Sequence, residues 1–175
     1  MNYWLITDTH FGHNKMPLYC GRPIGYEEII LKSLGQIPEG DILIHLGDIC
    51  FGKDDMWHEK FFASTSARKW LIRGNHDHKS NAWYLSHGWD MVCDKLQFEY
   101  MGKNLLFTHE PQPFPFESDP QPYDFNIHGH LHNMKHHENE ITRHNKLLLM
   151  AVEYTNYQPI TLENFIKRGG TYAEN

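Results

Sequence analysis

The sequence predicts a layered α/β domain with mixed β-sheets. Short apolar runs alternate with segments of helical spacing in the first half of the chain, and the second half is richer in strands. Several of these apolar runs stop at groups of Asp, Asn and His side chains. Because loops at strand ends carry the ligands in such folds, these polar groups mark the expected functional site.

The first strand and helix are expected within residues 2–34. Residues 2–7 are short, apolar and partly β-branched, which favours a buried strand that delivers the loop after it. We expect a loop over 17–25. Residues 26–34 carry apolar side chains near helical spacing, and Gly35 follows as a stop, so this segment predicts a helix.

Two further pairs of strand and helix follow. Strands are expected over 41–46 and 69–73, and helices over 54–62 and 80–87. Side-chain oxygens that accept a backbone N–H favour the start of a helix. The expected N-caps of these two helices and of a closing helix are Asp54 or Asp55, Ser80 and Thr161.

The remaining chain predicts mainly strands. Residues 95–100 and 104–108 flank a turn centred on Gly102, which suggests a hairpin. Residues 110–122 hold five prolines and are expected to form an ordered loop, because proline fixes φ and lacks an N–H donor. Two more strands and the closing helix are expected over 123–127, 146–152 and 161–168.

Length and composition predict one globular domain over residues 1–175. The chain is 40% hydrophobic and has a net charge of −6 with neutral histidine, which argues against a surface for long nucleic acids. Its three cysteines are an odd number at wide spacing, which indicates reduced thiols in a cytoplasmic protein. We expect no signal peptide and no membrane span, since the longest apolar run, 147–152, is far too short.

The polar groups at the strand ends have the composition of a metal site. Alternate residues of an extended segment point to the same side, so an Asp and a His two apart can meet one cation. A carboxylate can bridge two cations, and nitrogen and oxygen ligands without thiolates favour Mn, Fe, Zn or related ions. The candidate metal ligands are Asp8, His10, Asp48, Asn75, His109, His130 and His132.

Each of these groups alone fits an ordinary turn residue or a surface histidine. Their occurrence together and in this order is a much more specific signal. The chain resembles the small, single-domain bacterial and phage members of the calcineurin-like metallophosphoesterase family. The matching blocks are Asp8-x-His10, Gly47-Asp48, Gly74-Asn75-His76-Asp77, His109 and Gly129-His130-x-His132, and the resemblance spans residues 1 to about 155.

The resemblance implies a four-layer α/β/β/α sandwich and two divalent cations, with manganese expected first and Fe, Zn, Ni or Co as alternatives. One cation would bind Asp8, His10, Asp48 and His132. The other would bind Asp48, Asn75, His109 and His130, so that Asp48 bridges them. Two metals about 3.5–4 Å apart can hold a shared water as hydroxide, which attacks phosphorus in line.

The resemblance also implies two catalytic residues. His76 would donate a proton to the leaving oxygen, and Asp77 would orient the His76 ring. Arg22 is either a contact to a phosphate oxygen or a surface arginine that pairs with a carboxylate. His13 is either a phosphate contact or a supporting or surface histidine.

Other side chains favour structural interpretations. His45 is expected to be a satisfied core histidine, Arg73 to form an ion pair and His128 to support neighbouring ligands. The group His136, His137 and His144 predicts a solvated loop or hairpin more than another metal site. In the proline-rich loop, Phe114 and Phe116 either select the substrate or pack the loop down.

Together these features predict a metal-dependent phosphoesterase. A phosphodiesterase acting on a small or nucleotide-type ester is favoured. A phosphomonoesterase or nucleotide phosphatase and a DNA or RNA nuclease are the enzymatic alternatives. A scaffold on a degenerate site is disfavoured because every matching position is filled, and the chain is expected to be a monomer or homodimer.

Overall fold

The computed structural model describes residues 1–112, 122–133 and 146–170, and its described strands form two sheets. The first sheet has the order β4-β3-β2-β1-β9. β1 (Tyr3–Ile6), β2 (Ile42–His45), β3 (Arg68–Ile72) and β4 (Met91–Cys93) run parallel, and β9 (Ile160–Thr161) pairs with β1 in the antiparallel sense. This sheet is therefore mixed, as predicted.

The second sheet has the order β5-β6-β7-β8. β5 (Lys95–Tyr100) and β6 (Lys103–Thr108) form the predicted antiparallel hairpin. β7 (Phe125–His128) and β8 (Leu147–Leu149) extend it in parallel. Because the ends of β1, β2, β3, β6 and β7 carry the polar groups, parallel pairing brings those groups to one edge of the molecule.

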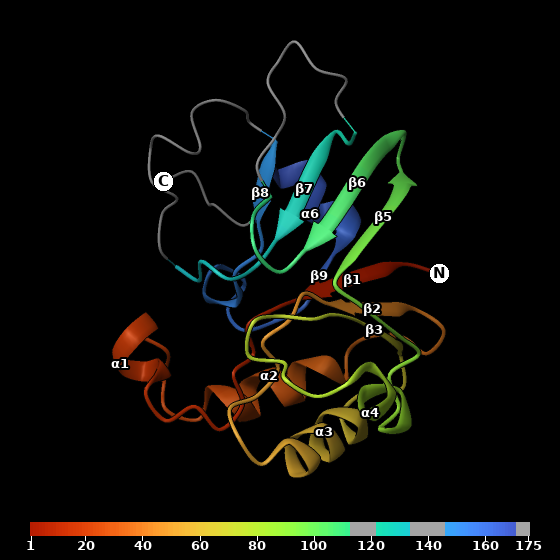
Figure 1. Ribbon diagram of the computed structural model, residues 1–175. Helices are drawn as coiled ribbons and strands as arrows, with labels where there is room; N and C mark the ends of the chain where they lie inside the picture. Colours follow the sequence, from red (N-terminus) through yellow and green to blue (C-terminus); the bar gives the residue numbers. More distant parts are fainter. Residues whose placement is uncertain (113–121, 134–145, 171–175) are drawn as a thin grey trace.

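The described helices lie mainly along the first sheet. Figure 1 shows α2, α3 and α4 on one side of the first sheet and the second sheet on its other side. α6 contacts β1 and β9. The helices are α1 (Met16–Cys20), α2 (Tyr26–Leu34), α3 (Asp54–Ala63), α4 (Asn81–Ser86), the 3₁₀ helix η1 (Val152–Thr155) and α6 (Leu162–Arg168). Two mixed sheets with helices outside them agree with the predicted fold class.

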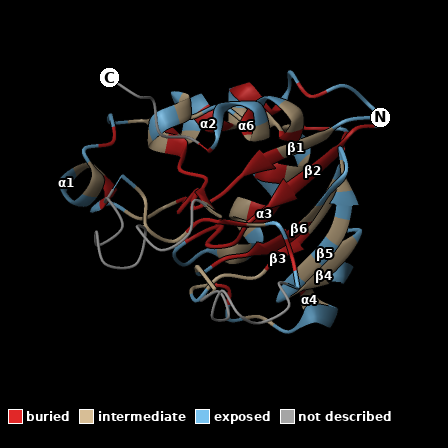
Figure 2. Ribbon diagram, turned by 90° about the horizontal axis from the view of Figure 1, so that it is seen from above, coloured by how far each residue is buried: buried red, intermediate tan, exposed pale blue. Residues whose placement is uncertain are grey.

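The apolar core lies within and between these layers. All four residues of β2 are buried, and the helices expose their outer faces (Figure 2). The sheets contact each other through aromatic rings, with the centroids of Tyr3 and Phe98 5.1 Å apart. No helix in the described part of the chain is long and apolar enough to cross a bilayer.

Some local predictions are wrong for identifiable reasons. The expected loop 17–25 begins inside the short helix α1, and β4 and β9 have only three and two residues, too few for a periodic pattern. The expected strand 146–152 stops at Leu149, and η1 follows.

The predicted helix caps were correct for two helices and wrong for one. Ser80 and Thr161 each accept a backbone N–H at the start of α4 and α6. α3 instead has Lys53 at its N-cap without a side-chain bond, and Asp54 and Asp55 lie in its first turn, where they complement the helix dipole. The predictions for Phe114, Phe116, His136, His137 and His144 fall outside the described residues.

Candidate metal centre

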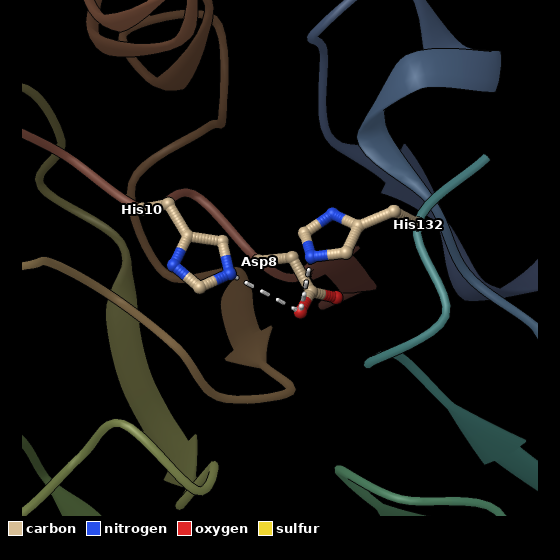
Figure 3. Close-up of side chains that lie close together, drawn as sticks. All are labelled: Asp8, His10 and His132. Carbon is tan, nitrogen blue, oxygen red and sulfur yellow. Dashed lines mark ion pairs between the residues drawn. The ribbon is translucent and has the colours of Figure 1, made fainter. Parts of the chain in front are cut away.

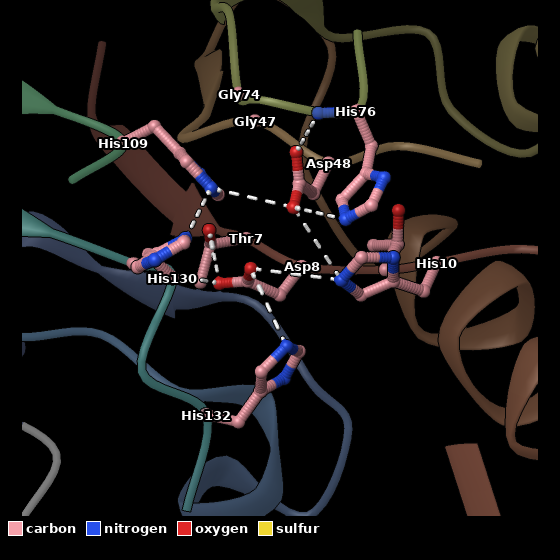
Figure 4. A network of polar contacts seen from close by, with 12 residues as sticks. Thr7, Asp8, His10, Gly47, Asp48, Gly74, His76, His109, His130 and His132 are labelled. Carbon is pink, nitrogen blue, oxygen red and sulfur yellow. Dashed lines mark hydrogen bonds and ion pairs between the residues drawn. The ribbon is translucent and has the colours of Figure 1, made fainter. Parts of the chain in front are cut away.

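The predicted ligands converge at the edge where parallel strands of both sheets end. Figure 4 shows the side chains projecting from the loops after these strands toward one another. β1 delivers Asp8 and His10, β2 delivers Asp48, and β6 delivers His109. Segments more than a hundred residues apart therefore contribute to one site.

The first group of candidate ligands is Asp8, His10 and His132. The Asp8 Oδ1 atom lies 3.8 Å from His10 Nε2 and 3.9 Å from His132 Nε2 (Figure 3). The other oxygen of Asp8, Oδ2, accepts hydrogen bonds from Thr7 Oγ1 (2.7 Å) and from the backbone N–H of His130 (3.0 Å). Oδ1 is buried with no hydrogen-bond partner in the described chain, so one carboxylate oxygen is fixed and the other points at the two imidazoles. This arrangement fits a bound cation.

The second group is Asp48, His109 and His130. The amide oxygen of Asn75 joins it, 2.9 Å from His109 Nε2 and 3.1 Å from His130 Nδ1. These are carboxylate, amide and imidazole donors without a thiolate, which fits Mn, Fe or Zn better than a structural cysteine site.

Asp48 lies between the two groups. Its Oδ2 atom is 3.6 Å from His10 Nε2, in the first group, and 3.3 Å from His109 Nε2, in the second. Its Oδ1 atom accepts the backbone N–H of His76 at 2.8 Å. One carboxylate thus reaches both groups, as a bridging ligand must.

The ligand-bearing backbone is strained. Five candidate ligands have positive φ although none is glycine: Asp8 (49°), His10 (44°), Asp48 (58°), His130 (70°) and His132 (51°). Such conformations are uncommon and gather at functional sites. The prediction that Asp8 and His10 converge through alternation along an extended segment is therefore wrong, because left-handed turns direct both side chains inward.

Two glycines make room for the carboxylates. A Cβ added at Gly74 would collide with the Asp48 side chain, and one added at Gly129 would collide with Thr7 and with the Asp8 carboxylate. The glycines of the Gly-Asn-His-Asp and Gly-His-x-His blocks are thus required by the close approach of two segments.

The electrostatics of the site favour positive charge. Burial alone would lower the pKa of His109, but its bond to Asp48 and the charges of Asp8 and Asp48 raise this pKa to about 9. Burial likewise opposes the shift at His132, where bonds to Cys20 and Glu153 and the charge of Asp8 raise the pKa to about 10. His10 differs because burial lowers its pKa to about 3. A neutral His10 beside two carboxylates is ready to ligate a cation.

His76 stands apart from the buried ligands. Its side chain is 37% exposed, and its Nε2 atom lies 4.0 Å from Asp48 Oδ2. The exposed ring of Phe51 lies beside it, with centroids 5.9 Å apart, and on the other side Phe51 contacts His13 at 4.5 Å. His13 also lies against His10, so His13, Phe51 and His76 form an aromatic rim next to the ligands.

Asp77 is placed differently from its predicted role. Its carboxylate accepts backbone N–H groups from Asp48 (2.8 Å), Ile49 (3.1 Å) and Gly74 (2.7 Å). No hydrogen bond joins it to the His76 ring in the described chain, so Asp77 holds the loop of Asp48 instead. Burial and the charge of Asp48 raise its pKa to about 6, against the opposing effect of the backbone donors.

The structure confirms one part of the predictions for Arg22, the pairing with a carboxylate, and contradicts its expected exposure. Its side chain is fully buried, so it is not a surface arginine, although it does pair with a carboxylate. Its Nε and Nη2 atoms donate to Glu153 Oε1 at 2.9 and 2.7 Å. Sequence reasoning missed Glu153, because a single glutamate outside every recognised block carries no signal. Cys20, His132 and Glu153 also lie within reach of one cation, but the Arg22 guanidinium already supplies positive charge there.

The structure confirms the structural interpretations of His45 and Arg73, and the supporting role of His128 stays a prediction. His45 is buried, and its ring pairs with Thr9 Oγ1 and the Gly47 N–H. Arg73 forms an ion pair with Asp94 at 2.6 Å. His128 is buried beside the Gly129 carbonyl, next to the ligand loop.

Comparison with known proteins identifies the class. Residues 1–152 match the model of the calcineurin-like phosphoesterase superfamily domain. The chain therefore belongs to this superfamily. The match includes every candidate ligand and stops one residue before Glu153.

Two proteins of similar length are its relatives. MJ1445, an uncharacterized protein of Methanocaldococcus jannaschii, is 26% identical over 176 residues, which cover 94% of this chain and 89% of the relative. AQ665 of Aquifex aeolicus, a solved structure of unknown function, is 27% identical. Its alignment covers 95% of this chain and 98% of that one, with a TM-score of 0.73, so the fold is shared over nearly the whole length.

Proposed function

We propose that this chain is a phosphoesterase that uses two divalent cations and acts on a small or nucleotide-type phosphodiester. Membership of the superfamily supports ester hydrolysis. The observation that carries the two-cation proposal is the position of Asp48 Oδ2, 3.6 Å from a nitrogen of one ligand group and 3.3 Å from a nitrogen of the other.

The ligands divide between the two cations by proximity. Asp8, His10, Asp48 and His132 would hold one cation, and Asp48, Asn75, His109 and His130 the other. The mixture of carboxylate, amide and imidazole suits manganese, and Fe, Zn, Ni or Co have compatible preferences. When bound, such cations act as Lewis acids on the phosphoryl oxygens and make a nucleophile available at neutral pH.

His76 is proposed to donate a proton to the leaving oxygen. Its ring is far more exposed than His10 and His109, so a substrate can reach it. Its backbone N–H is fixed to Asp48, which keeps it next to the ligands. A proton donor at the leaving oxygen typically contributes about 10²–10⁴-fold in rate.

The aromatic rim supports a substrate that carries a base or another flat group. Phe51 is 54% exposed, although large apolar side chains are usually buried. It lies between His13 and His76, so a flat leaving group at His76 would meet its ring. His13 is accordingly proposed to contact the substrate, and Arg22, with its buried guanidinium, is not.

The compartment is proposed to be the cytoplasm. Cys20, Cys50 and Cys93 are all free thiols, and Cys50 is buried. Such thiols are typical of reducing compartments. The net charge of −6 argues for small substrates over long nucleic acids.

The proposal is tested by a panel of phosphate monoesters, linear diesters and cyclic diesters, assayed with the chelated protein and after addition of Mn²⁺. We expect Mn²⁺-dependent turnover with linear or cyclic diesters preferred. Preference for monoesters would correct the substrate class, and absence of turnover on every ester with Mn²⁺ bound would reject the enzymatic function.

A further inference from the structure

We propose that Glu153, held by Arg22, orients His132 as a metal ligand and selects the ring nitrogen that His132 presents to the cation. Glu153 and Arg22 are thus positioning residues for one of the two cations. The inference rests on the proposed function, because His132 must be a ligand for its orientation to matter.

The pair is buried, and the hydrogen bonds that join it all use one carboxylate oxygen of Glu153, Oε1, because Oε2 has no hydrogen-bond partner in the described chain. The exposed fractions of the Arg22 and Glu153 side chains are 0% and 5%, and two N–H groups of the guanidinium donate to Glu153 Oε1. A buried ion pair loses much of its hydration, and further hydrogen bonds offset that loss. Here Arg22 also donates to the carbonyl oxygens of Thr9 (3.1 Å) and Asp8 (2.7 Å).

These bonds connect Arg22 to the strained backbone of the first ligand group. Asp8 has positive φ, and its carbonyl is one of the two that Arg22 holds. The guanidinium lies over the ring of Tyr26, 4.8 Å from its centroid, and the Tyr26 hydroxyl donates to the His10 carbonyl at 2.5 Å. Arg22 and Tyr26 therefore hold the left-handed turn that carries Asp8 and His10.

Glu153 connects the same pair to the third ligand of that group. Its Oε1 atom lies 3.2 Å from His132 Nδ1, while His132 Nε2 faces Asp8 Oδ1. Arg22 Nη2 also lies 3.2 Å from Nδ1. Arginine only donates and carboxylate only accepts, so the two neighbours favour opposite tautomers.

Glu153 decides between these tautomers. With the proton on Nδ1, His132 donates to Glu153 and leaves the Nε2 lone pair facing Asp8 and the cation. With the proton on Nε2, the ring would accept from Arg22 and could not ligate a cation through Nε2. Carboxylates behind ligating histidines commonly fix the tautomer in this way. Because Arg22 already has four other bonds, the carboxylate is the partner that Nδ1–H requires.

The test substitutes Glu153→Gln and follows Mn²⁺ binding to the chelated protein by calorimetry. The wild type is expected to show two binding events. In the variant, one event should weaken by about 10–100-fold, the range typical of lost partners behind metal ligands, and the other should be unchanged. The matched control is Glu163→Gln, which removes the carboxylate of an exposed pair with Lys167 on α6 and should change neither event.

A second variant keeps the proposal testable if Glu153→Gln does not fold. Removing one partner of a buried pair leaves an unpaired charge, whereas the double variant Arg22→Gln/Glu153→Gln removes both charges. Thermal unfolding of the chelated proteins establishes which variants are folded, and the double variant should also show one selectively weakened event.

The outcomes separate the two proposals. Two wild-type events that a folded Glu153→Gln variant retains at full affinity would overturn the positioning role and leave the proposed function standing. A wild type that binds no Mn²⁺ would overturn both. Equal weakening of both events, or unfolding of both variants, would show a general structural role and reject the selective one.

Discussion

The two ligand groups are held in different ways, and the contrast is clearest at His109 and His132. His109 Nδ1 lies 2.8 Å from the backbone carbonyl of Leu46, so the chain itself fixes its tautomer and leaves Nε2 for a cation. His132 Nδ1 instead faces the side chain of Glu153, in η1. Under the proposed function, a backbone carbonyl would orient the ligand histidine in one group and a buried ion pair would do so in the other.

This difference predicts where the site is sensitive to substitution. Side-chain changes cannot remove the Leu46 carbonyl, so the orientation of His109 is protected as long as the fold persists. The orientation of His132 depends on Arg22 and Glu153, which lie 131 residues apart in the chain. We therefore expect the cation at Asp8, His10 and His132 to be the more easily lost of the two.

The largest effect is expected where the two groups meet. Asp48→Asn should weaken both cations, because Asp48 Oδ2 is within 3.6 Å of His10 and 3.3 Å of His109. Turnover should fall by more than the about 10²–10⁴-fold that loss of a single proton donor typically costs. Asp8→Asn is the control that should weaken only one cation. Elemental analysis measures the metal content of each variant, and an activity assay measures its turnover. Unchanged metal content in Asp48→Asn would remove the basis for a shared ligand.

Removing His76 should separate catalysis from metal binding. His76→Ala should retain both cations, since this ring belongs to neither ligand group, but lose about 10²–10⁴-fold in turnover of esters with poor leaving groups. A nitrophenyl ester, whose leaving group needs no proton, should be affected much less. Equal losses on both esters, measured with metal content verified, would argue against proton donation.

A smaller effect is expected at the rim. Phe51→Ala should lower kcat/KM for base-bearing diesters, because the transition state would lose about 1–3 kcal/mol of stacking free energy. The kcat/KM for a methyl or other small aliphatic ester should be nearly unaffected. Phe51→Tyr is the conservative control and should retain the preference. If the alanine variant loses activity on all esters alike, Phe51 shapes the site without selecting the substrate.

The smallest effect at neutral pH is expected for His45, a buried histidine behind the candidate ligands, and it concerns the stability of the fold. Burial lowers the pKa of His45 to about 3, whereas the unfolded value is about 6.5. Between these values the unfolded chain binds a proton that the folded chain does not. The contribution of His45 to stability is therefore full above about pH 6.5 and declines as the pH falls, by up to about 1.4 kcal/mol per pH unit.

The variant His45→Gln isolates this contribution. Its free energy of unfolding relative to the wild type should rise as the pH is lowered from about 6.5 toward 4, measured by urea denaturation with a chelator present. The histidines that both proteins share contribute equally to the two free energies of unfolding, so their contributions cancel in the difference. A difference that does not change with pH would show that His45 titrates normally in the folded state.

The sequence predicted the architecture well where its patterns are local. Apolar runs located the strands that deliver the ligands, and Ser80 and Thr161 stood out as caps because capping involves only neighbouring residues. The polar blocks also identified the side chains that converge, since parallel strands bring their ends to one edge.

The parts that escaped prediction depend on distant contacts. Nothing in the sequence near Glu153 indicates that it meets Arg22 and His132. The contact forms only when folding brings η1 beside the segments that carry these two residues. Arg22 looked available for a substrate because its burial is a tertiary property. Asp77 looked like the partner of its neighbour His76, but the backbone N–H groups of Asp48 and Ile49, in a different loop, donate to its carboxylate.

Anomalous diffraction from Mn²⁺-loaded crystals would show whether two cations share Asp48. We expect two anomalous peaks about 3.5–4 Å apart, one at Asp8, His10 and His132, the other at Asn75, His109 and His130, with Asp48 between them. A single peak, or two peaks of which one does not contact Asp48, would contradict this expectation.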